Sequence, residues 1–186
     1  EDAGFTVRHV LAEGSVAVVT GPAGDAETLA GVKQVSSVTR DVAVELELPE
    51  VDAEEPSTPG EDAALRDLQW DKDLTDVSGA HEIATGDGAR IAIVDTGIDL
   101  NHPDLGNVNE DVPEIGPDDA GYHGTHVAGT AAATGETGVV GTAPDAELVP
   151  IRVFPADGGA TFGDILAGID YAAEIDADVA NFSLGI

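Results

Sequence analysis

Ala89-Arg-Ile-Ala-Ile-Val-Asp95-Thr-Gly-Ile-Asp-Leu-Asn-His-Pro-Asp-Leu105 is the stretch of sequence that decides the fold. It begins as a run of apolar, mostly β-branched residues, which is typical of a buried strand, and it stops at Asp95, followed by Thr96-Gly97. An acid that ends a buried strand lies at the carboxyl edge of a sheet, where open α/β sheets hold their ligands and their chemistry. The stretch therefore predicts an α/β fold with a functional carboxylate at position 95.

Helical and strand patterns alternate after this stretch. Residues 123–133 form a helical run of small side chains, residues 146–154 read as a strand, and residues 178–184 read as a final strand. Pro150 indicates either that the second strand is not in a fully hydrogen-bonded central position or that the strand contains a bulge. Alternating strands and helices predict a parallel sheet with helices on both faces.

A further helix is predicted between the last two strands. Thr161-Phe-Gly-Asp164 has the form of a capping box, in which the two side chains close the first turn of a helix. Apolar residues then repeat at helical spacing, namely Phe162, Ile165, Leu166 and Ile169.

The chain before this region reads as a small α+β unit over residues 1–48. It has expected strands at 5–11, 16–20 and 37–46, and an expected helix at 25–32 with Asp25 as a possible cap. Three strands and one helix make a thin core, so we expect the unit to lean on another part of the protein.

An acidic, proline-containing stretch divides the chain. Residues 49–62 hold three prolines and six acids and read as an exposed linker that is easily cleaved. Residues 63–186 follow as the main domain, and they begin with helical turns that we expect to pack the single tryptophan, Trp70, against that domain.

The charge of the chain is strongly negative. Its 186 residues carry 37 acids against 7 Lys and Arg, a formal net charge of −30, while 42% of the residues are hydrophobic. The apolar runs argue against a disordered acidic chain, so a folded protein with a solvated acidic surface, as in halophiles, is favoured. We expect its stability to rise with ionic strength as salt screens the repulsion.

Several classes of protein are disfavoured by composition. Nucleic-acid binding needs a basic patch, and the sequence has none. The chain has no cysteine, which excludes disulfides and thiolate metal sites. No stretch approaches the ~20 apolar residues that span a bilayer, and the chain begins at Glu1 without a signal peptide, which we expect to be missing, removed or outside this sequence.

His123 is the candidate partner of Asp95. A histidine can act as a general base near neutral pH, and a carboxylate on its other ring nitrogen fixes the tautomer and stabilises the imidazolium. For an Asp and a His alone, a satisfied structural pair is the favoured interpretation. His126, one turn further along, has no further ligands in a recognisable metal pattern and reads as structural.

Three motifs together resemble the subtilisin-like serine proteases, or subtilases. Ile91-Ala-Ile-Val-Asp95-Thr-Gly resembles the segment around their catalytic Asp, His123-Gly-Thr-His-Val-Ala-Gly-Thr130 the segment around their catalytic His, and Asn181-Phe-Ser-Leu-Gly185 their substrate-binding strand. The subtilase order along the chain is Asp, His, Ser. The resemblance implies a serine endopeptidase with Asp95 and His123 as catalytic residues, and our interpretation is that it is a secreted, halophilic archaeal form.

The nucleophile of that family is missing from this sequence. Subtilases carry it in a Gly-Thr-Ser-Met-Ala-like segment, and no Gly-Thr-Ser occurs here. In the family pattern Ser183 belongs to the substrate-pairing strand, so it is not the expected substitute. We expect the catalytic Ser and the oxyanion Asn to lie beyond Ile186, and we expect this chain alone to be inactive.

The resemblance extends to the N-terminal unit. Residues 1–48 resemble the later part of the subtilase inhibitor-type prodomain, which implies a zymogen whose prodomain chaperones and inhibits its own protease. Its tail, near residues 46–54, would then run through the cleft, with processing somewhere in residues 48–65. Two alternatives stay open: a non-catalytic pseudoprotease that keeps a peptide-binding groove, and an N-terminal unit that acts alone as an inhibitor.

The resemblance also implies a groove for an extended polypeptide substrate, which would add by main-chain bonds between two edge strands. Phe162 and Leu184 would line an apolar pocket, with plain core packing as the alternative. The full set of expected groove residues is Gly158, Gly159, Ala160, Phe162, Ser183, Leu184 and Gly185.

A structural Ca²⁺ ion is possible by the same resemblance, and no organic cofactor is implied. Asp104 lies where many subtilases place a calcium ligand, and Glu136 lies in the partner loop, which is one residue shorter than the common pattern. Carboxylate oxygens suit Ca²⁺; a solvated acidic loop is the alternative. The remaining acids of the long loop read as solvated surface, namely Glu110, Asp111, Glu114, Asp118 and Asp119.

Overall fold

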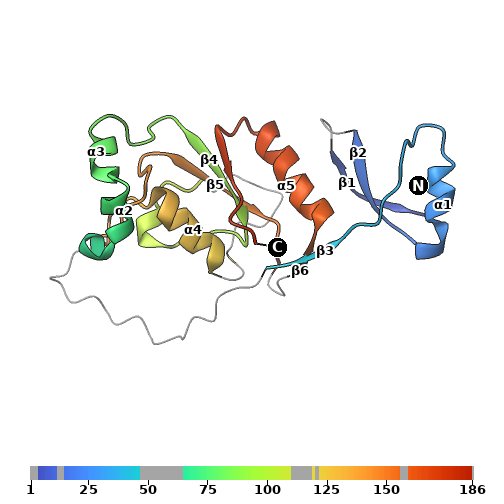
Figure 1. Cartoon of the computed structure of the whole chain (residues 1–186), viewed down its shortest axis with the longest axis horizontal. Helices are drawn as coiled ribbons and strands as arrows, with labels where there is room; N and C mark the ends of the chain where they lie inside the picture. Colours follow the sequence, from blue (N-terminus) through green and yellow to red (C-terminus); the bar gives the residue numbers. More distant parts are fainter. Residues whose placement is uncertain are drawn as a thin grey trace.

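The structure, a computed structural model, describes residues 4–11, 15–46, 65–109, 119, 122–155 and 159–185. Its centre is a parallel sheet of three strands in the order β5-β4-β7 (Figure 1). β4 is Arg90–Asp95, β5 is Glu147–Arg152 and β7 is Val179–Asn181. The predicted α/β fold with a parallel sheet is confirmed, and Asp95 is the last residue of the central strand.

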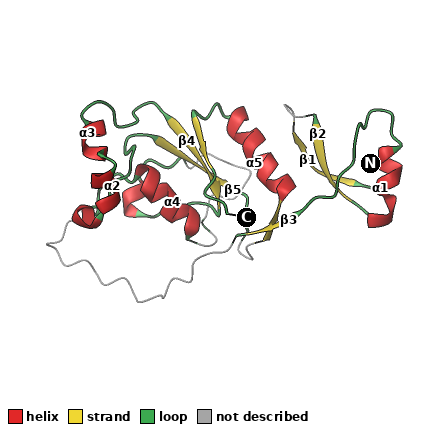
Figure 2. Ribbon diagram, viewed as in Figure 1, coloured by secondary structure: helices red, strands yellow, loops and turns green. Residues whose placement is uncertain are grey.

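Helices cover both faces of this sheet, as predicted (Figure 2). Val94 packs into a cluster with residues of α5, which spans Phe162–Glu174. Ile93, the preceding residue, packs into a second cluster with residues of α4, which spans His123–Ala132. Successive side chains of a strand point to opposite faces, so one short strand holds both helices in place.

The capping box at the start of α5 is also confirmed. The Thr161 hydroxyl accepts the backbone N–H of Asp164, and the Asp164 carboxylate accepts the backbone N–H of Thr161. Each side chain satisfies a donor that the first helical turn leaves without a partner.

The two outer strands are shorter than predicted. β5 ends at Arg152 and β7 covers only Val179–Asn181. Pro150 pairs with Ile93 of β4 without a register shift, and on its other side β5 makes an isolated parallel bridge from Leu148 to Val108.

The N-terminal unit begins as predicted, with an antiparallel hairpin of β1 (Thr6–Leu11) and β2 (Val16–Thr20). A 3-10 turn, η1 (Ala23–Asp25), leads into α1 (Ala26–Ala30). Asp25 is at the N-cap position of α1, but its side chain makes no capping hydrogen bond.

The predicted third strand of this unit is largely wrong. Only β3 (Ala43–Glu45) is a strand, and its partner is β6 (Gly159–Thr161) of the main domain, not β1 or β2. Val42 is exposed, so the alternation before β3 does not mark a buried face. The unit therefore leans on the main domain, as its thin core predicts, and its hairpin lies beside α5 (Figure 1).

Short helical turns precede β4, as predicted, but they do not bury the tryptophan. They are η2 (Leu65–Leu68), α2 (Trp70–Leu74) and α3 (Val77–His81), and a further turn, η3 (Pro103–Leu105), follows β4. Trp70 is 71% exposed. The buried residue of α2 is Lys72, at 4% exposure, whose ammonium donates to the carbonyl of Thr130 at 2.7 Å and to the hydroxyl of Thr142 at 2.9 Å.

Lys72 gives a prediction about pH. Burial lowers the pKa of the Lys72 ammonium, and the Asp71 carboxylate, 3.8 Å away, offsets this only in part. Between that lowered pKa and the ordinary value near 10.4, the unfolded chain binds more protons, so stability rises with pH. We expect the unfolding free energy of the wild type, measured by urea denaturation, to increase with pH relative to that of Lys72→Met. The increase should be about 1.4 kcal/mol for each unit by which folding lowers the pKa of Lys72.

The chain provides its own control for this experiment. Its other lysine, Lys33, is exposed, and Lys33→Met removes the same charge without a buried hydrogen bond. Parallel pH curves for the wild type and Lys72→Met would contradict the prediction.

The predicted linker at 49–62 lies outside the described residues. Within the described part of the chain, no helix is both long enough and apolar enough to cross a membrane.

Candidate active site

Asp95 and His123 form a hydrogen-bonded pair at the carboxyl edge of the sheet. The His123 ring nitrogen Nδ1 lies 2.8 Å from Oδ1 of Asp95 and 3.0 Å from Oδ2. Asp95 is fully buried, whereas the side chain of His123 is 22% exposed. The carboxylate holds one nitrogen of a partly accessible imidazole, and this is the geometry that fixes the histidine tautomer in a catalytic pair.

Close packing of α4 on the end of β4 makes this contact possible. A Cβ atom on Gly124 would lie 2.1 Å from the carbonyl oxygen of Gly97 and 3.2 Å from Cβ of Asp95. Gly97 itself has a φ of +106°, which favours glycine. The two glycines let the helix carrying His123 approach the loop that follows Asp95.

Thr96 and Asp119 connect the strand end to the helix start. The Thr96 hydroxyl donates to Oδ1 of Asp119 at 2.6 Å and accepts the N–H of Gly124 at 2.9 Å. Oδ2 of Asp119 accepts the N–H of Thr125 at 2.9 Å. The interpretation of Asp119 as solvated surface is therefore wrong. The other acids in that group, residues 110, 111, 114 and 118, lie outside the described residues.

The expected groove residues lie in two places. Gly159 and Ala160 are in β6, where they pair with Glu45 and Val44 of β3, and Phe162 follows as the half-exposed first residue of α5. Leu184 packs partly buried against the cluster that holds α5. Ser183 and Gly185 flank it after β7, and Gly158 lies outside the described residues.

Ser183 makes a local hydrogen bond after β7. Its hydroxyl donates to Oδ1 of Asn181 at 2.9 Å. That Ser183 is not the nucleophile stays a prediction.

Asp104 and Glu136, the two candidate calcium ligands, differ in their surroundings. Asp104 is buried, and its carboxylate accepts the N–H of Thr137 at 2.6 Å and the Thr137 hydroxyl. Glu136 is exposed. Among the described residues, no group of three His, Cys, Asp or Glu side chains could hold a metal ion. The Asp104 oxygens that a Ca²⁺ ion would use thus accept hydrogen bonds from Thr137, and Ca²⁺ binding stays a prediction.

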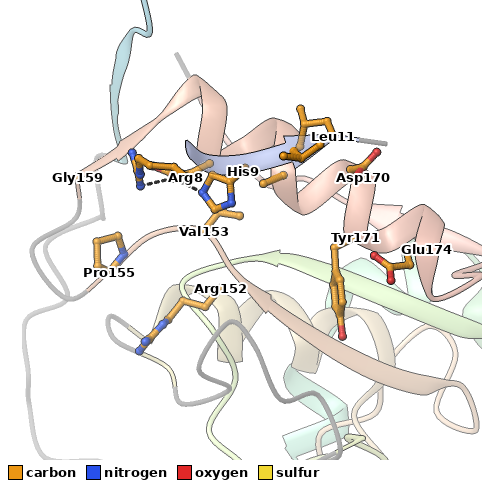
Figure 3. Close-up of a pocket in the computed structure, with 13 residues that line it drawn as sticks. Arg8, His9, Leu11, Arg152, Val153, Pro155, Gly159, Asp170, Tyr171 and Glu174 are labelled. Atoms are coloured by element: carbon orange, nitrogen blue, oxygen red, sulfur yellow. Dashed lines mark hydrogen bonds and ion pairs between the residues drawn. The ribbon is translucent and has the colours of Figure 1, made fainter. Parts of the chain in front are cut away.

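A cavity of about 640 Å³ lies elsewhere, where the hairpin of the N-terminal unit meets β5 and α5 (Figure 3). At its edge Arg8 donates to Oδ1 of Asp164 at 2.7 Å, and Nε2 of His9 lies 3.2 Å from the same oxygen. Burial alone would raise the pKa of Asp164, but the hydrogen bonds from Thr161, with Arg8 and His9 nearby, hold this pKa below its ordinary value. The Asp164 carboxylate is therefore negatively charged at physiological pH, and it binds Arg8 of the N-terminal unit.

The fold and this site define a class of protein. Residues 86–186, more than half of the chain, match the model of the subtilase family, and the chain belongs to that family.

Among its relatives, thermitase of Thermoactinomyces vulgaris is 45% identical over 117 residues, which cover 57% of this chain and 40% of thermitase. Subtilisin E of Bacillus subtilis (strain 168) is 42% identical over 106 residues, 54% of this chain and 28% of the relative. The minor extracellular protease Vpr of the same strain is 35% identical over 182 residues, 88% of this chain and 22% of the relative. The chain thus spans less than half the length of these relatives.

Proposed function

We propose that the complete protein is a serine endopeptidase, and that Asp95 and His123 are two members of its catalytic triad. The observation that carries the proposal is the contact between His123 Nδ1 and the buried Asp95 carboxylate, at the carboxyl end of the central strand. Membership of the subtilase family and the serine protease names among its relatives support it.

In this mechanism His123 is the general base. Its Nε2 takes the proton from a serine hydroxyl as that oxygen attacks the peptide carbonyl, and His123 then gives the proton to the leaving amine. A water molecule, activated by the same nitrogen, hydrolyses the acyl-enzyme. Asp95 keeps the proton of the neutral imidazole on Nδ1 and stabilises the imidazolium. The serine lies outside these 186 residues, in keeping with the absence of a Gly-Thr-Ser segment here.

The substrate is an extended polypeptide that pairs with β6, and the N-terminal unit inhibits the protease by occupying that strand first. Support comes from the antiparallel pairing of β3 with β6, in which Val44 lies opposite Ala160. Two further contacts hold the unit at the start of α5: Arg8 binds Asp164, and Asp41 accepts the N–H of Gly163 at 3.0 Å. The alignment with protease Vpr covers 88% of this chain and so extends well beyond residues 86–186.

A fluorophosphonate, which reacts covalently with activated serines, tests both parts of the proposal. We expect the full-length protein to be labelled and His123→Ala not to be labelled, because the serine is a weak nucleophile without its base. The 186-residue chain alone should remain unlabelled. After the folded protein is cleaved between residues 48 and 65 and the N-terminal unit is removed, labelling should become faster, since β6 is then free.

Asp87→Asn, a change to an exposed acid before β4, is the matched control and should be labelled like the wild type. Full-length protein that resists labelling with and without its N-terminal unit would favour the pseudoprotease alternative. Equal labelling rates before and after removal of the N-terminal unit would contradict the proposed inhibition by that unit, but not the proposed protease activity.

A further inference from the structure

The first turn of α4, which carries His123, receives no capping bond from its own N-cap residue. The N-cap is Tyr122, which has a φ of 64°, a side chain exposed to solvent, and no capping hydrogen bond. Helix N-termini leave N–H groups without intrahelical partners, and these need acceptors from elsewhere. His123 therefore depends on other residues for its orientation.

Thr96 and Asp119 supply those acceptors. The Thr96 hydroxyl accepts the N–H of Gly124, and the Asp119 carboxylate accepts the N–H of Thr125, each at 2.9 Å. The two acceptors are tied together, since Thr96 donates its hydroxyl proton to Asp119 at 2.6 Å. A negative charge near a helix N-terminus is also favourable with the helix dipole.

Thr96 additionally holds the other half of the pair. Its backbone N–H donates to Oδ1 of Asp95 at 2.7 Å, and this is the oxygen that lies 2.8 Å from Nδ1 of His123. Thr96 is 2% exposed, so water does not compete for these bonds. One residue thus contacts the carboxylate through its backbone and the histidine helix through its side chain.

We propose that Thr96 and Asp119 are positioning residues for the Asp95–His123 pair: together they form a remote cap that sets the angle of the first turn of α4 and thereby places the imidazole. The inference rests on the proposed protease function for its kinetic consequence, but its structural consequence holds in this chain without any catalysis. A misplacement of ~1 Å in a catalytic group costs about 100-fold in rate, so the network matters beyond its hydrogen bonds.

The test uses four variants. Thr96→Val removes the hydroxyl at nearly constant shape, and Thr96→Ser restores it. Asp119→Asn keeps one acceptor oxygen but turns an amide donor toward Thr96 or Thr125. Thr130→Val is the matched control, because Thr130 lies in the same helix and, among the described residues, its hydroxyl bonds only to the His126 carbonyl in the preceding turn, at 3.1 Å.

The first readout is proton NMR of the 186-residue chain. The Nδ1 proton of His123, shared with a carboxylate, should give a far-downfield resonance in the wild type, Thr96→Ser and Thr130→Val. It should be shifted upfield or lost by exchange in Thr96→Val and Asp119→Asn. Because no proteolysis is involved, failure here counts against the positioning role and not against the proposed function.

The second readout is peptide hydrolysis by the full-length protein. The concentration of active enzyme is corrected for the folded fraction, which is measured by circular dichroism. We expect kcat to fall about 10- to 100-fold in Thr96→Val and Asp119→Asn, with KM changed less than about twofold, and Thr96→Ser to recover most of the loss. The inference would be overturned if Thr96→Val gave the same His123 resonance and the same kcat as Thr130→Val. Equal losses in Thr96→Val and Thr96→Ser would overturn it as well, since the hydroxyl would then be irrelevant.

Discussion

If Asp95 belongs to a catalytic triad as proposed, asparagine in its place is expected to lower kcat of the full-length protein about 10⁴-fold, the magnitude of the corresponding change in a Ser-His-Asp protease. Asp95 is fully buried and contacts Nδ1 of His123 with both oxygens. An amide N–H at this position would donate to Nδ1 of His123 and so favour the histidine tautomer that carries its proton on Nε2. Nε2 must be unprotonated to act as the base. The measurement is steady-state hydrolysis of a peptide amide, with KM expected to stay near the wild-type value because the side chain of Asp95 has no exposed surface for a substrate to contact.

Asp87→Asn again provides the control for a lost negative charge in an exposed position. A loss of less than about tenfold in Asp95→Asn, with the protein folded, would show that the Asp95–His123 contact is structural only. That outcome would leave the fold intact and remove the main support for the triad.

Alanine in place of Gly124 is expected to destabilise the fold by roughly 3 kcal/mol, at the upper end for overpacking in a core. The new Cβ would lie 2.1 Å from the carbonyl oxygen of Gly97, and this neighbour is backbone that cannot rotate away. Relief requires α4 to move away from the end of β4, and this movement also separates His123 from Asp95. Urea denaturation of the 186-residue chain measures the first effect, and the lost downfield resonance of His123 reports the second.

Gly129→Ala is the matched control, because Gly129 lies in the same helix and a Cβ there meets no atom within 4 Å. This change should stabilise the chain by up to about 1 kcal/mol through helix propensity. If both substitutions had similar effects on stability, close packing at Gly124 would not be what positions α4.

The elements that build the sheet were predictable because each follows from a local pattern. The apolar run before Asp95 is a strand whose side chains pack on both faces, and the capping box at Thr161 begins a helix. Asp95 ends a strand and His123 begins a helix, and a carboxylate on one ring nitrogen orients a histidine, so the two residues were candidate partners. The motifs of the subtilase family then favoured a catalytic interpretation over a structural one.

The residues that the sequence did not predict depend on contacts between distant segments. Asp119 belongs to an acidic loop that looks solvated, yet it lies beside Thr96 and accepts from the first turn of α4. Lys72 is buried and Trp70 is exposed in α2, because the Lys72 ammonium reaches acceptors at Thr130 and Thr142, far along the chain. β3 finds its partner in β6, more than a hundred residues away, and no local periodicity encodes that pairing.

The structure of the full-length protein with a phosphonate bound to its reactive serine would show whether Asp95 and His123 serve a catalytic serine. We expect the modified serine to lie in a Gly-Thr-Ser-like segment outside these 186 residues, with its Oγ within hydrogen-bond reach of Nε2 of His123, about 2.6 to 3.2 Å. A phosphonate on Ser183, or on a serine whose Oγ lies far from His123, would contradict the assignment of Asp95 and His123 to a catalytic triad.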